Sequence, residues 1–276
     1  MFEEILQFYR IKINPHCKGK YASYVQARQH IKSGYEDTEL VEHVINNQKF
    51  WIKSEFSKYE YSFSDLRCLV PLLLTQDRNL YVTDLGGAAG DAYYKMRRFL
   101  DSAGLDKKLN WNVVETELMV EKARQLENGE LSFTDVKSFE MDIDKIITEE
   151  VSGCRILFSS STLQYLEDPE RFLTDIVSSK RYKYIYLSRT PFVENGSKII
   201  SIQHSKLASN GTPVVDTVDS SNNRVIDYVI TFLPLNTVKS IFEQNGYNLI
   251  MCIKEKEYMP TRNVCSQYYG MLAKIK

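Results

Sequence analysis

From residue 80 onward, short runs rich in β-branched and apolar residues alternate with segments of helical periodicity. Helices are predicted over 92–103 and 117–126, and a third starts after Asp168, which provides an N-cap followed by a proline at the first helical position. The predicted strands are 80–84, 109–115, 131–134, 155–160 and 182–188. Alternation of this kind predicts an α/β protein with a doubly wound, mostly parallel sheet.

The alternation stops after residue 188. Gly, Asn, Ser and Pro clusters surround two strand-like pieces there, and a helix and two strands then follow; these elements are 198–203, 224–232, 236–245, 247–255 and 267–275. Only a turn-bearing loop separates the last two strands, so we expect them to pair as an antiparallel hairpin. We expect the insert 189–233 to form a cap over the carboxyl edge of the sheet, where open α/β proteins bind ligands.

The first part of the chain has a different pattern, without regular alternation. Residues 1–78 are predicted to form a helical N-terminal extension, with helices around 37–56 and 64–75, the second capped by Ser64. Residues 79–276 then form the main domain, including the cap insert.

Composition narrows the class of protein. The 276 residues include 35 basic and 36 acidic side chains, a net charge of −1 that gives no electrostatic footprint for nucleic acid. Five dispersed cysteines without a Cys-x-x-Cys pair favour a reducing, cytoplasmic environment, and no His, Asp or Glu spacing predicts a metal. The longest apolar run, at 68–74, is too short to span a membrane, and the acidic start does not resemble a secretion signal.

The stretch "YVTDLGGAAGDAYY" at 81–94 places glycines at a strand-to-helix corner, where the backbone comes close to a ligand. A dinucleotide fingerprint Gly-x-Gly-x-x-Gly fits poorly, because it needs glycines where Ala88 and Asp91 stand. The pattern Asp-x-Gly-x-Gly-x-Gly fits better, with one alanine replacing a glycine: Asp84, Gly86, Ala88 and Gly90. A tight turn without a ligand is the alternative.

Two further features accompany this corner. Glu115 ends the second predicted strand, and "LQYLEDPE" follows the fourth. Together these motifs resemble class I S-adenosylmethionine-dependent methyltransferases. The resemblance implies a Rossmann-like fold and S-adenosyl-L-methionine (SAM) as cofactor, with Asp84 anchoring the loop or the cofactor's amino group and Glu115 accepting both ribose hydroxyls. The implied cofactor-binding residues are Asp84, Gly86, Gly87, Ala88, Gly90, Tyr93, Glu115, Thr116, Ser160, Ser161 and Tyr165.

A narrower resemblance is to uncharacterised methyltransferases of bacterial polysaccharide and cell-surface gene clusters. It rests on "GKYASYVQARQHIKSGY" (19–35), "SSSTLQYLEDP" (159–169), "SRTPF" (188–192) and "SIQHSK" (201–206). Tyr24 stands where that group usually has tryptophan, and Ser188 where it has aspartate. The substrate of the group is not carried over by this resemblance.

The expected function is methyl transfer from SAM to a small or glycan-linked acceptor, at oxygen in preference to nitrogen. His204 in the cap is the candidate general base, and Arg189 the candidate partner for an acidic group of the substrate. A non-catalytic protein that binds the cofactor or a partner is the second hypothesis. A nicotinamide-dependent oxidoreductase is the third, and the glycine spacing disfavours it. Oligomeric state is open.

Overall fold

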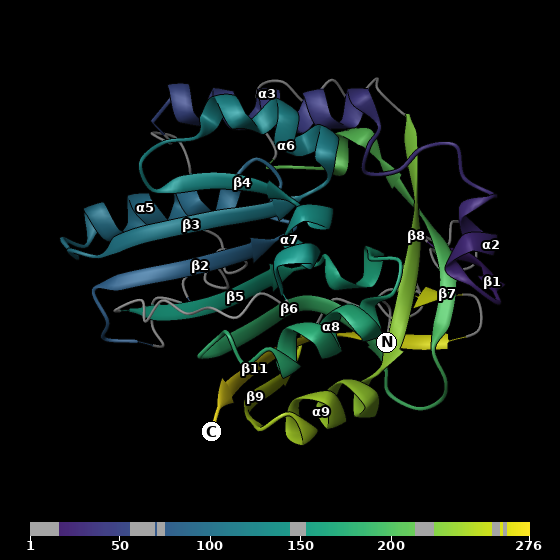
Figure 1. Cartoon of the computed structure of the whole chain (residues 1–276). Helices are drawn as coiled ribbons and strands as arrows, with labels where there is room; N and C mark the ends of the chain where they lie inside the picture. The colour runs from purple at the N-terminus through teal and green to yellow at the C-terminus, as the bar shows by residue number, and fades with distance from the viewer. Residues whose placement is uncertain are drawn as a thin grey trace, which may run out of the picture.

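A doubly wound sheet forms the centre of the computed structural model, which describes residues 17–55, 70, 75–143, 153–212, 224–255, 260–261 and 264–276. The strand order is β4-β3-β2-β5-β6-β11-β9 (Figure 1). The first five strands are parallel, and β11 lies antiparallel between β6 and β9. The bounds are β2 Asn79–Leu85, β3 Lys108–Glu115, β4 Leu131–Asp135, β5 Cys154–Ser160, β6 Tyr184–Val193, β9 Tyr247–Lys254 and β11 Val264–Ile275. The predicted Rossmann-like architecture with a C-terminal antiparallel hairpin is confirmed.

Helices cover both faces of this sheet. One face packs against α3 (Thr38–Lys53), α5 (Asp91–Ser102) and α6 (Glu117–Ala123), which a short 3-10 turn, η2 (Arg124–Leu126), extends. The other face packs against α7 (Val136–Ile143), α8 (Pro169–Ser178) and α9 (Leu235–Gln244). Thus α5, which follows β2, packs on one face of the sheet, and α8, which follows β5, packs on the other. The chain therefore reverses its winding direction between β2 and β5.

The insert 189–233 contains β7 (Ile199–Lys206) and most of β8 (Val225–Pro234), which form a second arm of the sheet at the right of Figure 1. These strands are antiparallel, and β8 joins the end of β6 through the pairs Phe192–Leu233 and Val193–Pro234. The N-terminal strand β1 (Cys17–Tyr21) pairs with β7, and the short β10 (Pro260–Thr261) links β1 to β11. The cap is therefore anchored to both ends of the described chain.

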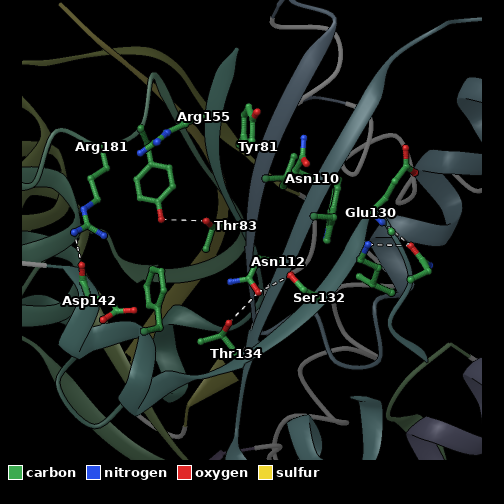
Figure 2. A pocket seen from close by; sticks show the side chains of 17 residues that line it. Tyr81, Thr83, Asn110, Asn112, Glu130, Ser132, Thr134, Asp142, Arg155 and Arg181 are labelled. Atoms are coloured by element: carbon green, nitrogen blue, oxygen red, sulfur yellow. Dashed lines mark hydrogen bonds between the residues drawn. The ribbon is translucent and has the colours of Figure 1, made fainter. Parts of the chain in front are cut away.

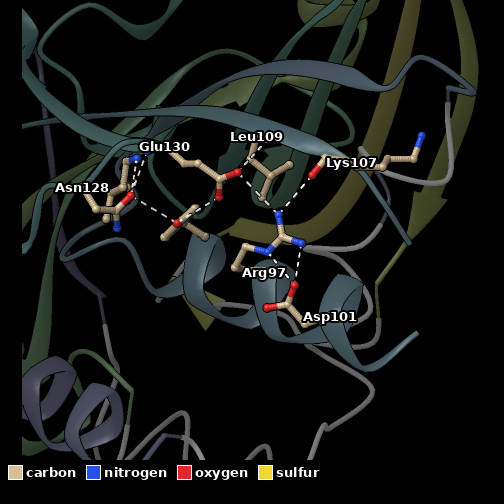
Figure 3. Close-up of polar contacts among 8 residues, drawn as sticks. Arg97, Asp101, Lys107, Leu109, Asn128 and Glu130 are labelled. Carbon is tan, nitrogen blue, oxygen red and sulfur yellow. Dashed lines mark hydrogen bonds and ion pairs between the residues drawn. The ribbon is translucent and has the colours of Figure 1, made fainter. Parts of the chain in front are cut away.

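Capping and ion pairs fix the helices where the sequence predicts them. Asp168 accepts a hydrogen bond from the backbone N–H of Arg171, with Pro169 at the first turn of α8. Figure 3 shows how Arg97 of α5 ties the helix to the sheet. Its guanidinium donates to Asp101 Oδ1 at 2.6 Å and to the carbonyl of Lys107, just before β3, at 3.0 Å.

Several elements differ from the sequence prediction. The extension contains β1 and a short helix, α2 (Tyr24–Arg28), neither of which was predicted, and α7 was missed as well. The strand predicted to end at residue 188 continues to Val193, because β11 supplies a partner for its last residues. Most of the helix predicted at 64–75, with its Ser64 cap, lies outside the described residues. Among the described helices, none has the length and hydropathy that crossing a membrane would require.

Candidate functional site

The reversal of winding between β2 and β5 defines where a ligand is expected, because the loops after these strands diverge to opposite faces. The loop after β2 holds the glycines, and the loop after β5 runs through Ser161 and Thr162 into a 3-10 turn, η3 (Leu163–Tyr165). The two loops touch. A Cβ added at Gly86 would lie 2.0 Å from Thr162 Oγ1. The sequence-predicted corner is thus at the switch point of the sheet.

The glycine loop has an unusual backbone. Gly86, Ala88 and Gly90 have φ values of +72°, +51° and +82°. Ala88 adopts the left-handed region despite its Cβ, which costs on the order of 1 kcal/mol and is typical of functional loops. A Cβ at Gly87 would lie 2.4 Å from Asp84 Oδ2, so the loop backbone packs directly on that carboxylate.

Asp84 is 1% exposed and accepts a hydrogen bond from Trp111 Nε1 at 3.1 Å. Burial is the main cause that raises the pKa of Asp84, to about 7, and the nearby carboxylates of Asp91 and Glu115 add to it. A buried carboxyl group of this kind favours a neighbouring cation, which would stabilise its ionised form. Asp91 itself is ion-paired with Lys95 at 2.7 Å.

Glu115 reaches the same loop from the end of β3. Its two carboxylate oxygens accept from the backbone N–H of Ala88 at 3.1 Å and of Thr116 at 2.9 Å. Burial raises the pKa of Glu115, and these two bonds lower it. The Thr116 hydroxyl is buried and has no hydrogen-bond partner within the described residues. It lies beside a cavity of about 480 Å³, further lined by Asp135, Val136 and Leu166 at the ends of β4 and η3.

The loop after β5 adds polar and aromatic groups. Ser161 has φ +61° and its hydroxyl accepts from Gln164 Nε2 at 3.0 Å. Gln164 is 1% exposed and its Oε1 has no partner in the described part of the chain. Ser160, at the end of β5, offers its carbonyl to the Thr162 hydroxyl at 3.4 Å. Thr116 Oγ1 and Gln164 Oε1 are thus polar atoms without a partner among the described residues, one on each side of the corner.

Three tyrosines from distant parts of the sequence meet at this loop. Tyr35 stacks on Tyr228 of β8 with ring centroids 4.2 Å apart, and its edge contacts Tyr165 at 5.1 Å. The Tyr165 hydroxyl donates to Gln203 Oε1 of β7 at 2.8 Å. Burial raises the pKa of Tyr35 well above its usual value, and Glu115 contributes to this electrostatically. The cap and the N-terminal segment therefore close over the loop that carries Tyr165.

Three predicted site residues lie elsewhere. The Tyr93 hydroxyl is within hydrogen-bond reach of Asn128 and Glu130, in the loop just before β4 and away from the glycine loop. His204 pairs with Asp227 (Nδ1–Oδ1 2.6 Å) on the face of β7 that packs against α2. Arg189 is an exposed residue at φ +50°, in a bulge of β6 and not at the end of that strand.

Sequence reasoning missed Tyr35, Tyr228 and Gln203 as parts of the site. Gln203 follows an apolar run in β7, and a polar residue there is the one signal that pointed to it. Tyr35 and Tyr228 carried no such sequence signal. Tyr228 comes next to Gln203 only through the pairing of β8 with β7. Within the described ranges, no group of three or more His, Cys, Asp or Glu side chains is arranged to hold a metal.

Comparison with protein-family models and with curated protein sequences gives no match. Solved structures with a similar fold include the glycopeptide N-methyltransferase MtfA in complex with SAM, with 13% identity, a TM-score of 0.45, and coverage of 79% of this chain and 90% of MtfA. The methyltransferase CcbJ from Streptomyces caelestis matches with 12% identity, a TM-score of 0.43, and coverage of 76% and 88%. LepI, solved with SAM, matches with 13% identity, a TM-score of 0.40, and coverage of 78% of this chain and 47% of LepI. At TM-scores this low, these similarities assign no ligand or activity to this chain.

Proposed function

We propose that this protein binds SAM at the glycine corner and transfers its methyl group. The observation that carries the proposal is the convergence of Asp84 and Glu115, from the ends of neighbouring strands, on one glycine-containing loop. Buried carboxylates at this position favour a ligand with a positive charge and vicinal hydroxyls.

The same charges argue against a dinucleotide. A pyrophosphate at the start of α5 would need backbone N–H groups free of competing anions. Here Asp91 occupies the first turn of the helix, and Asp84 and Glu115 lie near it. Lys95 pairs with Asp91, so the buried carboxylates of Asp84 and Glu115 are the groups that would repel a phosphate and stabilise an ammonium group.

Each residue then has a separate task. Asp84 and the loop backbone hold the amino acid end of the cofactor, and Glu115 accepts its ribose hydroxyls. Thr116 and the adjoining cavity take the base. When bound, SAM supplies a sulfonium methyl group for in-line displacement, a reaction that depends chiefly on alignment of the acceptor. Tyr165, held by Tyr35 and Gln203, would exclude water from the methyl group.

For the acceptor we propose a small or glycan-linked alcohol, the class of compound expected where gene clusters make surface polysaccharides; the narrower resemblance itself carries over no substrate. Gln203, whose side-chain oxygen accepts from the Tyr165 hydroxyl, is the polar group offered from the cap side, whereas Arg189 is exposed in the bulge of β6. His204 is a weaker candidate for a base in this arrangement, because it lies on the other face of β7 from Gln203.

Substitution Glu115→Gln is expected to weaken SAM binding by about 10- to 100-fold, because hydrogen bonds to a charged acceptor are worth about 1.5–3 kcal/mol. Calorimetric titration measures the affinity. The matched control is Glu121→Gln, further along α6, whose side chain is 67% exposed and which should bind SAM as the wild type does. Equal affinity in both variants would contradict the role given to Glu115.

A second candidate function is SAM binding without methyl transfer, and the placement of His204 away from the Tyr165 face favours it. Incubation with methyl-labelled SAM and a panel of sugars and polyols distinguishes the two. Label in an acceptor supports the enzyme. Tight SAM binding without labelled product across the panel supports the binding protein.

A further inference from the structure

A second cavity lies on the sheet face that α7 partly covers, in the half of the sheet nearer the amino ends of the strands. It has a volume of about 450 Å³ (Figure 2). Parallel sheets are normally apolar on both faces because helices cover them. Here the alternate residues of β2, β3 and β4 that line the cavity are polar: Tyr81, Thr83, Asn110, Asn112, Ser132 and Thr134.

The strand register aligns three of the lining side chains. Tyr81 of β2 is opposite Asn110 of β3 on one side and opposite Arg155 of β5 on the other. These residues form one cross-strand row, with neighbours about 4.8 Å apart, so the row is about 10 Å long. Tyr81 and Arg155 appear close together at the top of Figure 2.

The row carries hydrogen-bond donors that have no acceptor among the residues the structure describes. Asn110 Nδ2 is buried and has no partner there, and neither the Arg155 guanidinium nor the Tyr81 hydroxyl makes a hydrogen bond or ion pair within the same described ranges. The next row behaves differently. Asn112 Oδ1 accepts from Ser132 and Thr134, and the Tyr182 hydroxyl donates to Thr83 at 3.1 Å.

This cavity is distinct from the proposed cofactor site. Tyr81 precedes Asp84 by three positions, and alternation places the two side chains on opposite faces of β2. The Asp84 carboxylate contacts Trp111 on the α5 side, whereas Tyr81 faces the cavity. A ligand in the cavity would therefore not contact the glycine loop.

We propose that the row Arg155–Tyr81–Asn110 binds an anionic monosaccharide, such as a hexuronate or a sugar phosphate. The guanidinium would hold the carboxylate or phosphate by paired hydrogen bonds. Tyr81 and Asn110 would donate to ring hydroxyls. A simple anion cannot reach both ends of a row about 10 Å long, and the cavity has the size of typical small-molecule sites.

Calorimetric titrations with glucuronate, glucose 6-phosphate, glucose and inorganic phosphate test this proposal. We expect one or both anionic sugars to bind at least tenfold more tightly than glucose and phosphate. Preference between the two identifies the anion. Absence of binding by either sugar, or equal binding of inorganic phosphate, would overturn the proposal.

Two variants separate binding from folding. Arg155→Met should weaken the anionic sugar by at least tenfold and leave SAM affinity unchanged, whereas Arg124→Met on the exposed η2 turn should change neither. Asn110→Leu should also lose at least tenfold in sugar affinity, yet unfold at the same or a higher temperature, because it removes a buried unpartnered amide. Wild-type sugar affinity in Arg155→Met and Asn110→Leu would refute the site.

Discussion

Gly86→Ala is expected to destabilise the protein by about 2–4 kcal/mol, a large effect for one added methyl group. Two costs combine. A residue with a Cβ pays on the order of 1 kcal/mol at φ +72°, and the new Cβ would lie 2.0 Å from Thr162 Oγ1 and 2.6 Å from its Cβ. Overpacking of this kind typically costs about 1–3 kcal/mol. Thr162 cannot move away easily, because its own Cβ is part of the clash. Urea unfolding monitored by circular dichroism measures the change.

Gly104→Ala is the matched control. Gly104 has a similar φ of +63°, but a Cβ there meets no atom within 4 Å. It should therefore show only the backbone cost of about 1 kcal/mol. The double variant Gly86→Ala/Thr162→Gly should recover the overpacking part of the loss relative to Thr162→Gly alone. Equal destabilisation by Gly86→Ala and Gly104→Ala would contradict the close contact between the two loops.

Asp84→Asn is expected to remove a decrease in stability that the wild type shows between about pH 4 and pH 7. The folded pKa of Asp84 is raised to about 7 from 3.8, so folding takes up a proton in this window and ionisation disfavours the folded state. The contribution of Asp84 to stability is therefore highest below the pKa of Asp84 in the unfolded state, and it is lost as the pH rises through the pKa of Asp84 in the folded state. The difference in free energy of unfolding between Asp84→Asn and the wild type should therefore be about 3–4 kcal/mol more favourable to the variant at pH 8 than at pH 4.

Denaturant titrations of both proteins at several pH values test this expectation. Asparagine keeps an oxygen for Trp111 Nε1, so the substitution removes the charge and retains the contact. Glu117→Gln, which alters a carboxylate that is 77% exposed, serves as the control and should follow the wild-type profile. Parallel profiles for wild type and Asp84→Asn would show that Asp84 is ionised in the fold throughout this range.

The sequence predicted the central sheet because its signals were local. Alternating strands and helices, the Asp168–Pro169 start of α8 and the glycine corner all depend on residues within one or two turns of each other. The elements that were missed depend on distant partners. β1 is a strand because β7 pairs with it, and the last residues of β6 remain extended because β11 lies beside them.

The candidate site likewise contains residues whose positions follow from local sequence patterns and residues whose positions depend on tertiary packing. Asp84 and Glu115 both contact the glycine loop, since the carboxyl ends of adjacent parallel strands share one edge of the sheet, and the cofactor roles expected for them stay predictions. The sequence did not predict on which face of the sheet each side chain of the cap strand β7 lies. Gln203 and His204 are neighbours in sequence but lie on opposite faces, and only the packing of α2 decides which face is turned away.

A calorimetric titration of the wild-type protein with SAM and S-adenosylhomocysteine, with NAD as control, tests the proposed cofactor site most directly. With the buried carboxylates of Asp84 and Glu115 at the corner, we expect one site with micromolar affinity for the first two and no detectable binding of NAD. Absence of SAM binding, or tighter binding of NAD, would contradict the assignment of the glycine corner to this cofactor.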